Sequence, residues 1–282
     1  MRKKLRSEEN HLNHAFLLKT MPKLSPKLSV CLVVWNAQTL IANCLESVKD
    51  VADEIIIVHD GPCSDRTLEI CRRYTRKMYV RPFVGEAEPH RPFSFRKASG
   101  DWILWLDQDE RLTGPLRKNI RRLIARKDAD AYTFVWPVKY GTKNLSRGFF
   151  SRVRKRVLFR KSRIHDFHGL PNETLHVRGN TIDTPYTFIH LQSGERNTLR
   201  VFFSRTLRIV RIHARQLARK KLVRLPAPWY ACKAVLWFLL YLGYYYIIKC
   251  AWRTQADRSI SLQLALYNLY LYWYVFLEKM HS

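Results

Sequence analysis

The sequence predicts an α/β fold built on a mostly parallel central sheet, because strand and helix patterns alternate over its first hundred residues. The strand patterns are short apolar runs rich in β-branched residues, which are typical of strands buried on both faces. Apolar residues at helical spacing lie between them, and acidic residues directly follow two of the runs. This combination is typical of a doubly wound sheet that binds ligands at the carboxyl ends of its strands.

The first predicted strand covers residues 28–35 (LSVCLVVW) and follows an arm of mixed basic and polar residues over 1–27. Residues 38–49 carry apolar side chains at helical spacing, so we expect a helix there. A second strand is predicted at 54–59 (EIIIVH), and the turn formers that follow it lead into a helix at 67–74.

A fourth strand (WILWL) ends directly at a run of acidic residues, 107–110. The less regular second half of this domain carries one helical pattern and several short strand patterns. The remaining predicted elements are strands at 78–80 and 102–106, a helix at 116–125, and strands at 131–138, 157–159 and 187–190.

The composition changes near residue 195. Residues 196–224 hold ten Lys and Arg and no acidic residue, and they predict a basic amphipathic helix. Residues 229–248 follow with a single charge at Lys233, and residues 257–280 form a further aromatic-rich helical pattern. The apolar face of the basic helix is predicted to hold Leu199, Phe203, Leu207, Val210, Ala214 and Leu217.

Composition narrows the function classes. The 282 residues are 47% hydrophobic and 26% charged, which excludes a disordered or collagen-like chain. The net charge of +27 predicts attraction to nucleic acid, anionic lipid or phosphorylated ligands. None of the six cysteines forms a C-x-x-C pair, so zinc-ribbon and thioredoxin sites are not expected and the thiols are expected to be reduced. The apolar run at 15–18 is too short for a signal-peptide core.

The acidic residues at the strand ends are the first candidates for chemistry. Asp107 and Asp109 are separated by one residue, which lets both carboxylates approach a divalent cation that bridges nucleotide phosphates. The alternative is that these acids simply begin a helix. Asp60 ends the second strand, where an acid can contact a base or ribose. For Asp65 we favour a role in turn formation and helix capping.

Three sequence stretches carry a family resemblance. Residues 100–110 read G-D-W-I-L-W-L-D-Q-D-E, residues 52–67 read A-D-E-I-I-I-V-H-D-G-P-C-S-D-R-T, and the first strand ends in V-V-W-N-A at Asn36 and Ala37. With these stretches the chain resembles a family 2 glycosyltransferase with the GT-A fold. The resemblance is strongest to the bacterial branch that adds sugars to lipopolysaccharide or lipooligosaccharide core.

Weaker resemblance continues toward the C-terminus. The family's His-Glu segment resembles L-P-N-E-T, which puts Glu173 at the acid, and a later family His falls on His190 in F-I-H. The chain departs from the family pattern at three points. Ala37 stands in place of a Glu, His90-Arg91-Pro92 in place of Gln-Arg-Asn, and Asn172 in place of the His beside Glu173.

The resemblance implies a role for each candidate residue. Asn36, Asp60, Arg91 and Asp107 would contact the nucleotide-sugar donor. Asp107, Asp109 and His190 would hold Mg²⁺ or Mn²⁺. Glu173 would be the general base that takes a proton from the acceptor hydroxyl. From the residues alone three alternatives stay open: a hydrogen-bonded core histidine at His190, a solvated cation at Arg91 and an exposed loop acid at Glu173.

The implied activity is an inverting transfer of a sugar, expected from a UDP-sugar, to a lipid-linked or cell-envelope glycan. Two other classes remain as alternatives. A nucleotidyltransferase could use the same sheet and acids, but no Gly-rich phosphate loop follows the first strand. A basic nucleic-acid-binding protein would explain the charge. Its aromatic residues would not be expected to concentrate in the most apolar segment, so nucleic acid is an unlikely partner.

We therefore predict three regions: an arm at 1–27, a GT-A domain at 28–195 and a membrane-association region at 196–282. Cations near an anionic leaflet each gain about 1 kcal/mol. Tyr, Trp and Lys233 make residues 229–248 poor solutes for the hydrocarbon core. We expect a helix or shallow hairpin lying in the interface on the cytoplasmic face of the membrane, with a single membrane span as the alternative.

Overall fold

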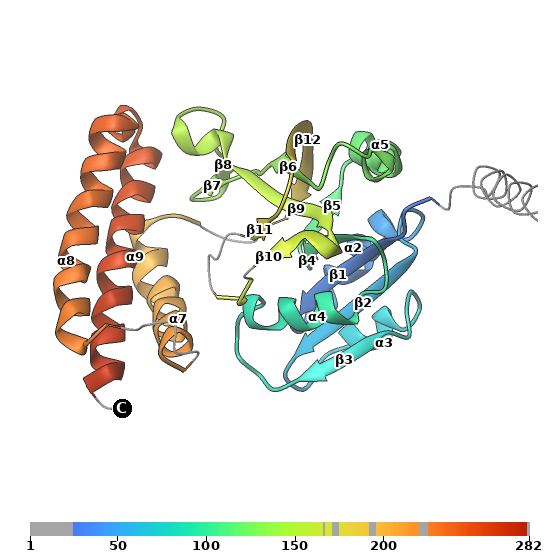
Figure 1. Ribbon diagram of the computed structural model, residues 1–282, viewed down its shortest axis with the longest axis horizontal. Helices are drawn as coiled ribbons and strands as arrows, with labels where there is room; N and C mark the ends of the chain where they lie inside the picture. Colours follow the sequence, from blue (N-terminus) through green and yellow to red (C-terminus); the bar gives the residue numbers. More distant parts are fainter. Residues whose placement is uncertain (1–24, 166, 171–174, 192–195, 220–224, 281–282) are drawn as a thin grey trace, which may run out of the picture.

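The computed structural model describes residues 25–165, 167–170, 175–191, 196–219 and 225–280. A central sheet with helices on both faces forms the larger part, and a bundle of helices formed by the C-terminal residues lies beside it (Figure 1). The strand order in the sheet is β3-β2-β1-β4-β9-β6-β12-β5. The strands are β1 (Leu28–Val34), β2 (Glu54–Asp60), β3 (Met78–Arg81), β4 (Trp102–Asp107), β5 (Glu110–Leu112), β6 (Ala131–Val135), β9 (Arg154–Arg160) and β12 (Thr181–His190).

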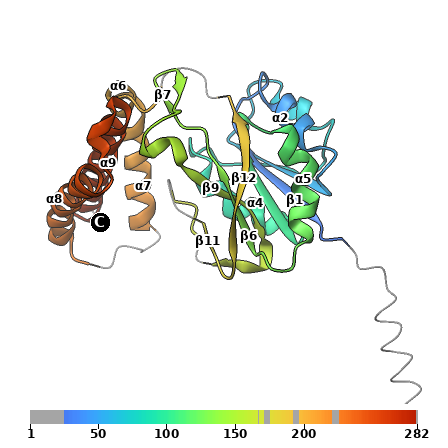
Figure 2. The ribbon, with the colours of Figure 1, turned by 90° about the horizontal axis from the view of Figure 1, so that it is seen from above.

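The first four strands form the doubly wound unit that the sequence predicts. β1 pairs in parallel with both β2 and β4, and β2 pairs in parallel with β3. Connections between parallel strands are right-handed, so the helices before β2 and β3 cover one face and the helix before β4 covers the other, as Figures 1 and 2 show. These helices are α2 (Ile41–Val48), α3 (Thr67–Cys71) and α4 (Arg91–Lys97).

Burial explains why these segments fold as strands. All seven residues of β1 are buried, as are the first five of β4, because helices cover both faces of the sheet. β9 runs antiparallel to β4 and β6, and β5 runs antiparallel to β12. The predicted strand at 131–138 ends at Val135, two residues before Pro137, which has no N–H for the ladder.

The remaining elements complete the domain and the helical bundle. In the domain they are α5 (Gly114–Ala125), β7 (Lys139–Tyr140), β8 (Lys143–Asn144), β10 (Ile164–His165), β11 (His176–Val177) and the 3₁₀ turns η1 (Glu88–His90), η2 (Phe149–Arg152) and η3 (Lys161–Arg163). The C-terminal elements are α6 (Leu199–Val201), η4 (Phe202–Thr206), α7 (Leu207–Arg219), α8 (Ala227–Gly243), η5 (Tyr244–Ile248), η6 (Ala251–Arg253) and α9 (Gln255–Met280).

The apolar face predicted for the basic helix is not continuous in the structure. Phe203 and Leu199 are exposed, whereas Phe202 is buried in the core between α7 and α9. The reason is a π-helical turn over Phe202–Thr206, which changes the helical period there. The second half agrees with the prediction, since Val210 and Ala214 pack in this core.

Candidate active site

The candidate site lies where the carboxyl ends of three neighbouring parallel strands meet. β1, β2 and β4 end near Trp35, Asp60 and Asp107, and a cleft of about 430 Å³ opens at this edge of the sheet. The lining includes Trp35, Asp60, Glu86, Asp109, Lys155 and His190, together with Arg208 from α7. The topology thus gathers side chains that are far apart in sequence, from Trp35 after β1 to Arg208 in α7, as such sheets do for ligands.

Asp60 is buried at the end of β2 and organises the loop that follows β3. Its carboxylate accepts hydrogen bonds from the backbone N–H groups of Val84 (2.6 Å) and Gly85 (2.7 Å). The Nε2 atom of His90 lies 2.8 Å from the same carboxylate. Asp60 therefore shapes one wall of the cleft, and its predicted contact with the donor stays a prediction.

Asn36 joins the turn after β1 to the turn after β2. Its side-chain amide donates to Ser64 Oγ at 2.7 Å, and its Oδ1 accepts from the backbone N–H of Ser64 at 3.0 Å. The backbone of Asn36 is left-handed, with φ +40°, a conformation that Asn tolerates better than most residues. The structure thus gives Asn36 a role in shaping the turn, and the predicted donor contact is untested.

Asp107 at the end of β4 carries two ion pairs. Its Oδ1 lies 2.6 Å from the guanidinium of Arg91, and its Oδ2 lies 3.2 Å from Nζ of Lys155. Arg91 is buried, with its guanidinium 4.0 Å from the ring centre of Trp105, so the alternative of a solvated cation at this position is wrong. Burial by itself would raise the pKa of Asp107, but the two cations outweigh it and hold the pKa well below its ordinary value.

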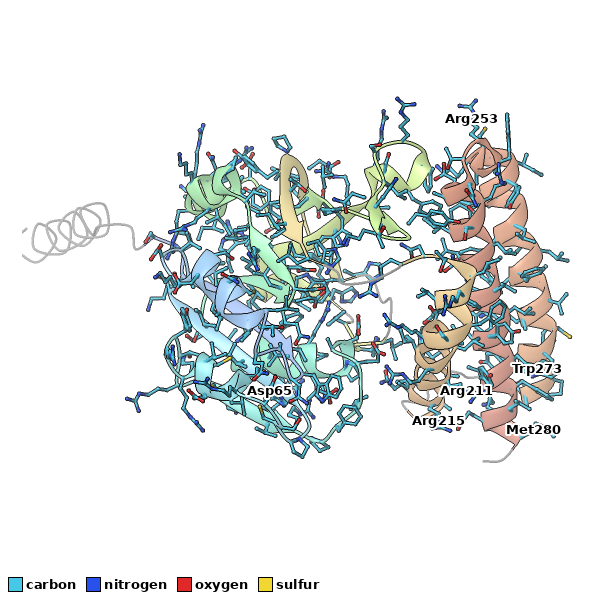
Figure 3. The ribbon with its side chains drawn as sticks, turned by 180° about the vertical axis from the view of Figure 1, so that it is seen from behind. Asp65, Arg211, Arg215, Arg253, Trp273 and Met280 are labelled. Carbon is cyan, nitrogen blue, oxygen red and sulfur yellow. The ribbon has the colours of Figure 1, made fainter. Side chains whose placement is uncertain are left out.

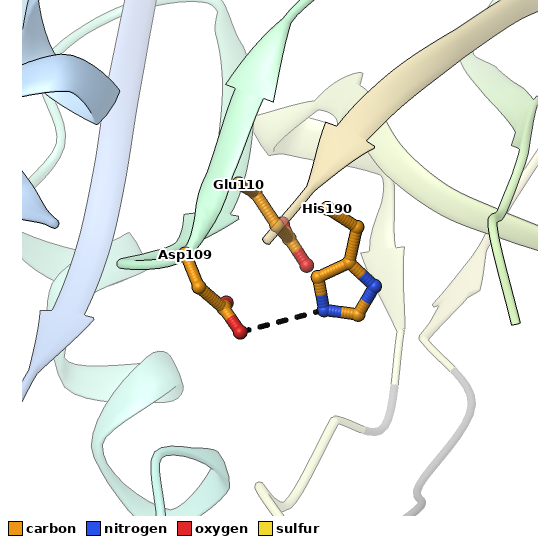
Figure 4. A group of neighbouring side chains, drawn as sticks. All are labelled: Asp109, Glu110 and His190. Carbon is orange, nitrogen blue, oxygen red and sulfur yellow. Dashed lines mark ion pairs between the residues drawn. The ribbon is translucent and has the colours of Figure 1, made fainter. Parts of the chain in front are cut away.

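A second group of side chains comes together where β4 and β12 end. Asp109, Glu110 and His190 each offer a ligand atom, and these atoms lie within 4.8 Å of one another. Figure 4 shows Asp109 and His190 facing each other, and Oδ2 of Asp109 lies 3.6 Å from Nε2 of His190. The antiparallel pairing of β12 with β5 sets His190 opposite Glu110 and so builds the group.

The donor set of this group suits a divalent cation. Two carboxylates and one imidazole are ligands that Mn²⁺ accepts, and Mg²⁺ takes the carboxylates. Glu110 is buried, and its burial together with the Asp107 carboxylate raises its pKa above the ordinary value. A bound cation would favour its ionised form. Nδ1 of His190 lies 3.4 Å from the Pro137 carbonyl, so this ring also has a hydrogen-bond partner, as the alternative reading expected.

Glu173 lies outside the residues that the structure describes, so its predicted role as base stays a prediction. The sequence reading did not single out Glu110 or Lys155 as site residues. A signal for Glu110 was present, because Glu110 ends the acidic run. Lys155 lies among other basic residues, so the sequence could not distinguish it from a solvated cation.

Glu86 is a partly buried acid in the cleft, and it gives a pH-dependent prediction. Burial, with the neighbouring Glu88 carboxylate, raises its pKa from 4.5 to about 7, while Arg208 and Arg91 oppose the rise and Asp60 adds to it. The unfolded chain releases this proton near pH 4.5 and the folded chain near pH 7, so stability falls between these values. We expect Glu86→Gln to raise the free energy of unfolding at pH 8 by about 1–3 kcal/mol and to leave it unchanged at pH 4. Urea denaturation at both pH values checks this, and an equal gain at both would contradict it.

Comparison with known proteins places this site in a family. Residues 29–181, more than half of the chain, match the model of glycosyl transferase family 2. A protein of Rickettsia typhi named as an uncharacterized glycosyltransferase is 28% identical over 153 residues, which are 53% of this chain and 51% of that protein. The lipopolysaccharide core biosynthesis glycosyltransferase LpsC of Rhizobium meliloti is 32% identical over 114 residues, 38% of this chain and 40% of that protein. The chain thus spans about half, or less, of the length of these relatives.

Two solved structures are similar at low identity. One is glucosyl-3-phosphoglycerate synthase from Mycobacterium tuberculosis in complex with Mn²⁺, UDP and glucosyl-3-phosphoglycerate, at 14% identity and a TM-score of 0.44 over 70% of this chain and 81% of that one. The other is the mannosyltransferase PcManGT from Pyrobaculum calidifontis in complex with GDP-Man and Mn²⁺, at 13% identity and a TM-score of 0.44 over 88% and 87%. On the family match, with the mostly parallel sheet of the GT-A fold, this chain belongs to glycosyl transferase family 2.

Proposed function

We propose that this protein is an inverting glycosyltransferase that moves a sugar from a nucleotide-sugar, a UDP-sugar by the family resemblance, to a hydroxyl of a lipid-linked or cell-envelope glycan. The observation that supports it best is the group of Asp109, Glu110 and His190 at the edge of the cleft, inside or beside the region that matches the family. LpsC, to which part of this chain is similar, is named for lipopolysaccharide core biosynthesis.

The residues of the cleft have different proposed roles. Asp109 and His190, with Glu110 behind them, would hold Mg²⁺ or Mn²⁺, which neutralises charge on the diphosphate. Asp107 holds Arg91 and Lys155 in place, so two cations stand beside the position proposed for the diphosphate. The proposal also includes Asp107 as a ligand of the cation, as the sequence predicts.

Glu173 is proposed as the base that removes the proton of the acceptor hydroxyl while that oxygen attacks the anomeric carbon. Attack from the face opposite the leaving nucleotide inverts the configuration. Support comes from the resemblance of the segment L-P-N-E-T to the His-Glu segment of the family.

Donor profiling tests the proposal. The protein is incubated with Mn²⁺ and, in turn, UDP-, GDP- and dTDP-sugars, and the released nucleotide is measured. Release of nucleoside diphosphate supports a glycosyltransferase, whereas release of pyrophosphate in the presence of a sugar phosphate and a nucleoside triphosphate would support a nucleotidyltransferase. Salt-sensitive binding of DNA with no release from any donor would support the nucleic-acid-binding alternative.

We also propose that the helical bundle rests on the cytoplasmic face of the membrane. By length and composition, Ala227–Ile248 and Gln255–Met280 are apolar enough to cross a bilayer. Large apolar side chains of the first segment face solvent, among them Leu236, Leu239, Leu240, Ile247 and Ile248. An anionic bilayer suits this face because the basic helix α7 lies in the same bundle.

The packing of the hairpin formed by α8 and α9 favours an orientation along the membrane surface. At the start of α9, the Asp257 carboxylate accepts hydrogen bonds from the backbone N–H groups of Phe149 and Phe150 in the catalytic domain. At its other end, Glu278 pairs with Arg215 of α7 at 3.0 Å. A hairpin that crossed the bilayer would carry its turn about 30 Å away from the domain. Contact of both ends with the rest of the protein supports a monotopic arrangement.

Replacing Leu239 and Leu240 together by Glu tests the membrane surface. We expect the double variant to bind vesicles of phosphatidylethanolamine and phosphatidylglycerol at least tenfold more weakly than the parent, because buried charge opposes insertion of the apolar face. Vesicle cosedimentation measures this. Val80→Glu, at an exposed apolar position on β3, is the control that should bind like the parent. Equal binding by the double variant would refute the proposed surface.

A further inference from the structure

Arg208 lines the cleft, and among the side chains of α7 that the structure describes no other basic one does so. The helix lies between the catalytic domain and the hairpin, as Figures 1 and 2 show. Its buried residues, Val210 and Ala214, pack in the core shared with α9. Residue 208 precedes Val210 by two positions and so projects from the opposite side of the helix. The docking of α7 on the hairpin therefore turns Arg208 toward the site.

Two other arginines of α7 are held by α9. The guanidinium of Arg211 lies 5.0 Å from the ring centre of Tyr274, and Nε of Arg215 lies 3.0 Å from the Glu278 carboxylate. Figure 3 shows Arg211 and Arg215 along this helix, beside the hairpin. By contrast, Arg208 makes no hydrogen bond or ion pair with any residue in the described part of the chain. Its side chain is exposed at the cleft, where a ligand can reach it.

Two other charges of the lining, Lys155 and Asp60, have fixed partners. Lys155 faces the carboxylates of Asp107 and Glu110, and Asp60 holds the loop after β3. The positive charge of Arg208 acts on Glu86 and lowers the pKa of that carboxyl group. A guanidinium that lines a polar cleft and lacks a fixed partner is suited to a phosphate group, which it can bind through two parallel N–H donors.

We propose that Arg208 binds the diphosphate of the nucleotide-sugar and of the nucleoside diphosphate product, so that the C-terminal helical region supplies part of the donor site. This inference rests on the proposed function. A nucleoside diphosphate carries more negative charge than a single divalent cation neutralises. Arg208 adds a positive charge to the cleft from α7. Because α7 packs on the hairpin, the affinity for the donor then depends on the position of the helices that are proposed to rest on the membrane.

Equilibrium binding of UDP and GDP with Mn²⁺ tests the inference in the full chain. We expect Arg208→Ala to weaken the binding of whichever diphosphate the parent binds by tenfold or more, and Arg208→Lys to recover part of the loss. Binding of the corresponding nucleoside, uridine or guanosine, should be unchanged, since it has no phosphate. Arg215→Ala, which removes the same charge from the same helix through an exposed ion pair, is the matched control and should bind like the parent.

The outcomes separate this inference from the proposed function. If Arg208→Ala binds the diphosphate as tightly as Arg215→Ala does, Arg208 has no role in donor binding, and release of nucleotide from a nucleotide-sugar by the parent would still support the proposed function. If the nucleoside loses affinity as much as the diphosphate does, Arg208 acts through the shape of the cleft and the inference is wrong. A parent protein that binds neither UDP nor GDP with Mn²⁺ overturns the inference together with its basis.

Discussion

Asp109→Ala is expected to abolish sugar transfer and to leave the protein folded. The Asp109 carboxylate lies 3.6 Å from His190 at the edge of the cleft, and its backbone carbonyl accepts a hydrogen bond from Leu191 that the substitution keeps. Loss of the side chain removes one of the cleft-lining ligands of the proposed cation. Because the cation neutralises the leaving diphosphate, we expect turnover to fall by about a thousandfold or more.

Three measurements check this result. Release of nucleoside diphosphate at saturating Mn²⁺ gives the turnover, and thermal unfolding shows whether the fold is intact. Titration of Mn²⁺ in the presence of UDP should show weaker cation binding in the variant. Asp128→Ala is the control, since Asp128 is an exposed acid that pairs with Arg126 outside the cleft. Unchanged turnover of Asp109→Ala would overturn the assignment of the cation site.

Glu173→Gln is expected to lower kcat by about a hundredfold or more with little change in the affinity for the donor. A general base acts on the acceptor hydroxyl in the transition state, so its loss affects the rate more than ground-state binding. Initial rates at varied donor concentration separate kcat from KM. Equilibrium binding of UDP with Mn²⁺ provides an independent measure of donor affinity.

Asp166→Asn is the matched comparison for Glu173→Gln. Both acids lie in the stretch between β10 and β11, and each substitution exchanges a carboxylate for an amide of the same size. We expect Asp166→Asn to keep most of the parent's turnover. If Asp166→Asn is inactive and Glu173→Gln is active, the base has been assigned to the wrong acid.

The sequence predicted the first strands of the sheet because each of them can be recognised from its own residues. Leu28–Val34 and Trp102–Asp107 are apolar along nearly their whole length, and a strand of this kind is stable only when both of its faces are covered. The turns after the strands and the stretch at residues 100–110 were equally local signals. They sufficed to predict the family, which the match over residues 29–181 confirms.

Local patterns failed where the backbone departs from a regular helix. The spacing of apolar residues placed Phe203 on the apolar face of the basic helix, but the π-helical turn makes Phe202 the residue that is buried in the bundle core. Helical periodicity assumes 3.6 residues per turn, and one wider turn shifts every residue before it relative to those after it. Nothing in the amino-acid pattern marks the position of this turn.

The sequence by itself determined the α/β class, the order of the first four strands along the chain and the presence of carboxylates at the ends of β2 and β4. Only the tertiary structure decided which of those carboxylates are engaged by other parts of the protein. Asp107 is engaged by cations from α4 and β9, while Asp109 meets His190 from β12. It also decided that Arg208 of the basic helix lines the cleft. The physical reason is that electrostatic contacts depend on distance in space, and the pairing of β9 and β12 and the packing of α7 set those distances over long separations in sequence.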